Sequence, residues 1–125
     1  MILLCARCQI PISSDIRELR DRNLISNEDG SDFVPRGYYF ITRADDDMIS
    51  SQGEFVLNLK DTINTKHHSD QSRLNGCCAL DGLDGINTLC ANGHEIGTEC
   101  SDCWMPHYIH IPPNHVDVVE STNVA

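Results

Sequence analysis

The sequence predicts a mostly β, small α+β fold: one antiparallel β domain with a single short helix near its N-terminus. Short runs of alternating apolar and polar residues recur along the chain. Asn-Gly and Asp-Gly pairs, which favour tight turns, are concentrated after residue 74. Only one segment carries helix signals, and 125 residues suffice for one modest core. We expect this domain to span residues 1–119 and the tail over 120–125 to fray.

The helix signals lie in "SSDIRELRDRN", residues 13–23. Asp15 can cap a helix, and Glu18 occupies the position where a capping box places an acidic residue. Ile16 and Leu19 then form a narrow apolar stripe, because residues three apart share a helix face. This segment therefore predicts the short helix.

The strand signals begin with "GYYFITRA" (37–44) and "EFVLNLK" (54–60), joined by the polar "DDDMISSQG" (45–53). The polar segment 61–73 predicts a surface loop. Further along, residues 86–91 and 94–99 are expected to form a hairpin about Asn92-Gly93. Two more strands are expected at 107–111 and at 115–119.

The seven cysteines indicate metal ligation more than disulfides, because we expect a cytoplasmic protein in which thiols stay reduced. The opening "MILLCARC" lacks the features of a signal peptide, and no apolar run approaches the roughly 18 residues that a membrane span needs. Cys5 and Cys8 form a C-x-x-C pair, which one tight turn can present to a zinc ion. The following "QIPISS" begins no helix at the second cysteine, so a redox dithiol is disfavoured.

The partner of this pair has two candidates. Cys100 and Cys103 repeat the C-x-x-C spacing and are the cleaner match. Cys90 and His94 flank the Asn-Gly turn, and a strict two-residue hairpin would place them on opposite sides of the sheet. A turn that wraps around an ion is not a strict hairpin, however, and its free amides can bond thiolates.

The segment "LCANGHEIG" resembles the second knuckle of small zinc-ribbon and β-tent proteins, the group that includes cereblon-type ligand-binding domains. "GCCALDGLDGIN" with the later "GHEIGTE" and "SDCW" is similar to a set of small uncharacterised bacterial proteins in which Cys-x-Cys-Gly can stand at the turn. Here Asn92 stands where a cysteine is expected, and His94 can replace the missing sulfur. The resemblance covers "CARC" and roughly residues 75–111. The aromatic cage of the cereblon type has no counterpart, since Trp104 is the only Trp.

The resemblance implies a zinc-ribbon or β-tent-like domain held by a structural Zn²⁺ with four protein ligands. We predict that these ligands are Cys5, Cys8, Cys90 and His94. Cys5 and Cys8 with Cys100 and Cys103 are the alternative set.

A second cluster is expected at the end of the hairpin away from its turn, formed by Cys77, Cys78, Cys100, Cys103 and Trp104. Its thiols can be packed as small apolar groups. They can form a second metal site with His107. They can also include a reactive thiol beside Asp81, Asp102 or His107, but the acidic surroundings would raise its pKa and weaken it as a nucleophile.

Charge is distributed unevenly along the chain, whose formal net charge is -10. Arg73 is the last Lys or Arg, and seven acidic residues follow it. Nucleic-acid binding is disfavoured, because phosphates require Lys and Arg. The favoured function is a non-enzymatic zinc domain that presents an acidic surface to a basic protein partner, for example as an inhibitor or immunity-type protein. The alternatives are a metal-handling protein with a second Cys-rich site, and a thiol- or metal-dependent enzyme using Cys77, Cys78 and Cys103.

Overall fold

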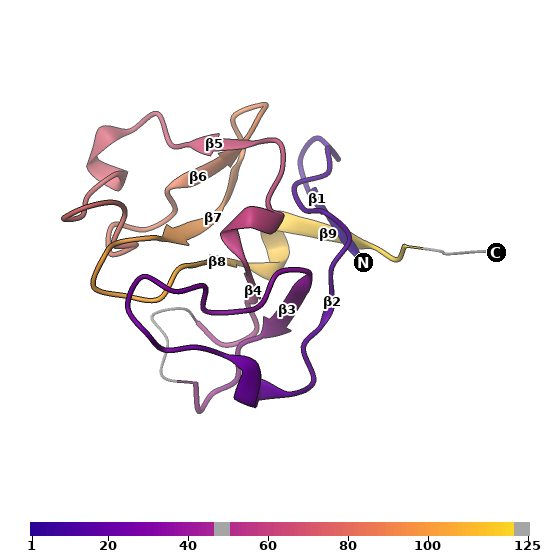
Figure 1. The fold of residues 1–125 in the computed structure, drawn as a ribbon. Helices are drawn as coiled ribbons and strands as arrows, with labels where there is room; N and C mark the ends of the chain where they lie inside the picture. Colours follow the sequence, from indigo (N-terminus) through magenta and orange to yellow (C-terminus); the bar gives the residue numbers. More distant parts are fainter. Residues whose placement is uncertain (47–50, 122–125) are drawn as a thin grey trace.

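A computed structural model describes residues 1–46 and 51–121 of the chain (Figure 1). Strands are its main elements, and their bounds are β1 Ile2–Cys5, β2 Arg17–Glu18, β3 Tyr38–Ile41, β4 Phe55–Leu57, β5 Thr65–His67, β6 Thr88–Cys90, β7 Glu95–Cys100, β8 Tyr108–Ile111 and β9 Val116–Val119. Four 3-10 turns accompany them, at Arg22–Leu24, Leu59–Asp61, Gln71–Arg73 and Pro113–His115. The fold is therefore mostly β, as predicted.

The strands form two sheets. The larger one has the order β2-β3-β4-β8-β7-β6-β5, and all its pairings are antiparallel except the parallel β2–β3 edge. The smaller sheet pairs β1 with β9, so the first and last strands lie side by side (Figure 1). Neither sheet closes on itself.

Alternation along the central strands divides the core between the two faces of the larger sheet. Phe55 and Leu57 of β4 belong to one apolar cluster, while Val56 between them belongs to the other. The first cluster also contains Leu3 and Val116 from the smaller sheet. Burial thus joins the two sheets on one face, as period-two side-chain alternation allows.

The predicted helix over 13–23 is wrong, and the described residues contain no α-helix. The segment runs extended, and the amides of Arg17 and Leu19 donate to the carbonyl oxygens of Gly37 and Tyr39. Ile16 is buried in the first apolar cluster and Leu19 in the second. Residues three apart point to opposite sides of an extended chain, so the same apolar pair that suggested a helix stripe serves both faces.

The other predicted elements fare better. The strands expected over 37–44, 54–60, 107–111 and 115–119 and the hairpin about Asn92-Gly93 are confirmed. All are shorter than expected except β7, which is shifted by one residue. The expected surface loop over 61–73 instead contains β5, which pairs with β6 at the edge of the larger sheet. Residues 47–50 of the expected linker and 122–125 of the expected tail lie outside the described residues.

Gly97 in β7 allows a close approach to the neighbouring strand β8. A Cβ atom at this position would lie 2.6 Å from the carbonyl oxygen of His110 and 2.9 Å from Cγ1 of Ile111. Both contacts are with β8, at the centre of the larger sheet. The glycine therefore permits β7 to pair with β6 through its first half and with β8 through its second half.

Candidate metal centre

The turn after β1 presents the first two donors. Cys5 ends β1, and its carbonyl oxygen accepts from the amide of Gln9 at 2.8 Å while its own amide donates to Ile10 at 2.9 Å. Gln9 adopts a positive φ of 65°, which turns the chain back sharply. The turn thus holds the sulfurs of Cys5 and Cys8 within 4.8 Å of each other.

The turn between β6 and β7 presents the other two donors. The amide of Gly93 donates to the carbonyl oxygen of Cys90 at 2.8 Å, and the amide of Cys90 donates to the carbonyl oxygen of His94 at 2.8 Å. Gly93 has a φ of 90°, a conformation that favours glycine. The turn wraps so that the Cys90 sulfur lies 3.4 Å from Nδ1 of His94. The expectation that a strict hairpin would separate the two side chains therefore does not apply.

The structure brings the four side chains together into one group, Cys5, Cys8, Cys90 and His94, here called the four-donor group. The Cys5 sulfur lies 3.7 Å from Nδ1 of His94, and the sulfurs of Cys8 and Cys90 lie 3.8 Å apart. All four donor atoms lie within 4.8 Å of one another. The four-donor group could hold a metal ion, and it joins the smaller sheet to the larger one.

Hydrogen bonding and burial shift the pKa values of two thiols in the four-donor group. The side-chain amide of Asn92 donates to the Cys8 sulfur at 3.2 Å, and this bond is the largest cause that lowers the pKa of Cys8 to about 6. Burial raises the pKa of Cys5, which is fully buried. Asn92, which the sequence marks only as the residue replacing an expected cysteine, thus supports a thiolate from outside the donor set.

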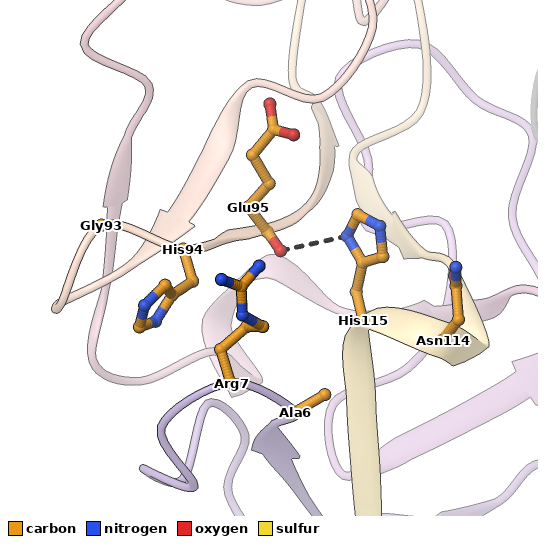
Figure 2. A pocket seen from close by; sticks show the side chains of 7 residues that line it. All are labelled: Ala6, Arg7, Gly93, His94, Glu95, Asn114 and His115. Carbon is orange, nitrogen blue, oxygen red and sulfur yellow. Dashed lines mark hydrogen bonds between the residues drawn. The ribbon is translucent and has the colours of Figure 1, made fainter.

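A polar groove of about 450 Å³ opens beside the four-donor group (Figure 2). The ring of His94 and the side chain of Arg7 line it, and His115 donates from Nδ1 to the carbonyl oxygen of Glu95 at 3.0 Å. The sulfurs of Cys5 and Cys90 belong to fully buried residues. The groove therefore gives access to the imidazole and leaves these two thiols shielded.

The alternative ligand set is not brought together. Cys100 is fully buried in the second apolar cluster, where burial raises its pKa to about 11. Its pKa is lowered in part by a hydrogen bond with the hydroxyl of Tyr108. Cys100 thus behaves as a packed apolar side chain, and it takes no part in either group of donors that could hold an ion.

The remaining cysteines form a second group, here called the three-thiol group: Cys77, Cys78 and Cys103. All three are exposed and free, and the sulfurs of Cys78 and Cys103 lie 2.8 Å apart. Packing as buried apolar groups therefore does not describe them. The side chain of His107 donates to the carbonyl oxygen of Asp102 at 3.0 Å and is not among these donors.

Asp102 organises the loops that carry the three-thiol group. Its carboxylate is fully buried and accepts five N–H bonds, from the indole of Trp104 and from the backbone amides of Cys77, Cys78, Ala79 and Cys103. These bonds hold its pKa far below the usual range, with those from Cys77 and Cys78 the largest causes. The sequence gives no signal that separates Asp102 from the neighbouring surface acids, so its role was missed.

Comparison with known protein families, curated proteins and solved structures finds no match to this chain. Fold and site together define a mostly β domain with a Cys₃His group able to hold a metal ion. Within residues 1–46 and 51–121, no helix has the length and apolar character required to cross a membrane.

Proposed function

We propose that this chain is a non-enzymatic domain folded around one structural zinc ion and that it presents an acidic surface to a basic protein partner. The observation that carries the first half is the spacing of the four-donor group. A tetrahedral zinc ion with bonds of about 2.3 Å to sulfur and about 2.0–2.1 Å to nitrogen places two sulfurs about 3.8 Å apart and a sulfur and a nitrogen about 3.5 Å apart. The sulfur–sulfur distance of 3.8 Å and the sulfur–nitrogen distances of 3.4 and 3.7 Å match these edges.

The donor types support zinc and a structural role. Three thiolates and one imidazole are soft and borderline ligands, which zinc prefers over carboxylates. Four protein ligands leave no coordination position for a substrate or a water molecule, so the ion would have no catalytic task. Thiolate ligands must stay reduced, and the proposal therefore places the protein in the reducing cytoplasm.

Native mass spectrometry with elemental analysis tests the zinc ion. We expect the chain, purified under reducing conditions and dialysed against a weak chelator, to retain one zinc ion. The Cys8→Ser variant should lose it, because one of four ligands is gone, while the Cys100→Ala variant should keep it. A wild-type chain without a retained ion, or one that holds a different metal, would contradict the proposal.

The acidic residues after Arg73 support the second half of the proposal. Asp102 is buried and contributes nothing to the surface, but the other six are at least partly exposed, and four of them, Asp84, Glu95, Asp117 and Glu120, are exposed. An exposed field of one sign steers an oppositely charged protein toward it and opposes nucleic acid. The partner should therefore carry Lys and Arg at its contact surface.

Pull-down from the source cell at low and high salt tests this interaction. We expect capture of a basic protein that weakens several-fold at high salt, because exposed charges are screened. Combining Asp84→Asn with Glu120→Gln should weaken capture further, whereas the control pair Glu28→Gln with Asp29→Asn, equal in charge but in the N-terminal half, should not. Equal capture by both pairs or salt-insensitive capture would overturn the acidic-surface proposal and leave the zinc proposal standing.

A further inference from the structure

The three-thiol group differs from the four-donor group in its exposure. Its three sulfurs all belong to exposed residues and come from two loops far apart in the sequence, whereas Cys5 and Cys90 of the four-donor group are buried. All three sulfurs lie within 4.8 Å of one another. Exposed thiols that converge from separate loops need a structural cause, because nothing in apolar packing draws them together.

The structural cause is a set of hydrogen bonds that holds the two loops in place. Asp102 binds the amides of Cys77, Cys78 and Cys103 through one buried carboxylate. The amide of Ser101 also donates to the carbonyl oxygen of Leu80 at 2.8 Å. A Cβ atom on Gly76 would lie 1.7 Å from the carbonyl oxygen of Ala79, so only glycine permits this turn. The backbone beneath the three sulfurs is therefore ordered before any ligand arrives.

The described surroundings supply no fourth protein ligand. The Asp102 carboxylate is occupied by its five N–H donors, and the ring nitrogens of His107 do not lie within 4.8 Å of all three sulfurs. Cys100 is buried with the Tyr108 hydroxyl. An ion at the three sulfurs would thus keep one position open toward solvent, as catalytic and exchangeable sites do and structural sites do not.

We propose that Cys77, Cys78 and Cys103 form a second metal site, which binds a thiophilic divalent ion of the zinc class through three sulfurs and leaves its fourth position open. Soft thiolate donors select zinc-class and copper(I) ions over magnesium and calcium. Three thiolates leave a net charge of -1 around a divalent ion but -2 around copper(I). The buried carboxylate of Asp102, which binds the amides of all three cysteines, opposes the more negative copper(I) complex.

Binding requires one small adjustment. Two sulfurs on one zinc ion lie about 3.8 Å apart, whereas those of Cys78 and Cys103 lie 2.8 Å apart. Both side chains are exposed, so rotation of either one can open this gap without disturbing the core. The open position then admits water or a thiolate from an acceptor protein, and the ion exchanges more readily than the ion of the four-donor group.

Zinc titration of the fully reduced chain, followed by native mass spectrometry, tests this second site. We expect two ions per wild-type chain, one retained against a weak chelator and one removed by it. Cys103→Ser and Cys77→Ser should each weaken the labile ion by more than about 100-fold, since loss of an outer-sphere partner alone costs about 10–100-fold. Cys100→Ala, which removes a thiol outside both groups, should still bind two ions. Magnesium and calcium added in excess should not displace zinc from the three sulfurs, because both ions prefer oxygen ligands.

Three outcomes would overturn this second site. If the reduced wild-type chain binds a single ion, the second site does not exist. If both Cys77→Ser and Cys103→Ser still bind two ions, the labile ion is held by other residues. Displacement of zinc by excess magnesium or calcium would show that oxygen ligands, and not these thiolates, hold the labile ion. Circular dichroism of each variant confirms that its fold is intact. The retained ion reports separately on the four-donor group, so its loss would contradict the structural-zinc proposal and not this one.

Discussion

Removal of the ion from the four-donor group is expected to unfold the domain. Binding of a structural zinc ion contributes on the order of 10 kcal/mol to folding. A domain of this size has a total stability of about 5–15 kcal/mol, so the loss is comparable to the whole. Under the zinc proposal the fold depends on this group, because Cys5 ends β1 of the smaller sheet and Cys8 lies in the next turn, while Cys90 and His94 flank a turn of the larger sheet.

Thermal unfolding followed by circular dichroism, with and without a strong chelator, measures this dependence. The Cys90→Ser variant should behave as the chelated wild type, with loss of cooperative unfolding. Cys77→Ser is the matched control, since it removes an exposed thiol and should change stability by less than about 0.5 kcal/mol. A chelated chain that melts cooperatively near the wild-type temperature would show that the apolar clusters hold the two sheets together unaided.

Replacing Asp102 by asparagine is expected to produce the second large effect. The amide keeps the shape of the carboxylate, but its NH₂ group points a donor at N–H groups that are themselves donors. Several of the five N–H groups now bonded to the carboxylate would then lose their partner in a buried position. We expect the melting temperature to fall by on the order of 10 °C.

Asp84→Asn is the matched control for this substitution. Asp84 is an exposed acid of the same half of the chain, and its carboxylate accepts one bond from the side chain of Asn75 at 2.9 Å. Its replacement should leave the melting temperature within a degree or two. Hydrogen exchange of the Cys77 and Cys78 amides adds a local measurement, because these amides should lose protection in Asp102→Asn. Similar melting temperatures for both variants would remove Asp102 from its organising role.

Strands rich in apolar residues could be predicted from the sequence, and strands without them could not. The composition of β4 predicts a buried strand, because Phe55, Val56 and Leu57 are all apolar. β5 carries Lys66 and His67, which are exposed, because an edge strand needs only backbone pairing on one side. Nothing in its side chains distinguishes it from a polar loop.

The candidate metal ligands show how spacing and burial compete. Bare spacing favours Cys100 with Cys103, yet Cys100 lies on β7 and faces the core, while Cys103 lies in the following loop. Two cysteines at ligand spacing therefore separate when the strand ends between them. The pair at 90 and 94 was selected through its resemblance to zinc knuckles, and the structure places both side chains beside Cys5 and Cys8. No spacing pattern in the sequence marks Asp102, because most of its partners are backbone amides.

The pairing of β1 with β9 has a consequence for biosynthesis. Cys5, Cys8 and the edge of β1 leave the ribosome long before β9, the strand with which β1 pairs. The nascent chain thus carries two unligated thiols and an open strand edge while the intervening elements are translated. Completion of the small sheet and, under the zinc proposal, capture of the ion by all four ligands are therefore late events, exposed to oxidants and to competing chains in the meantime.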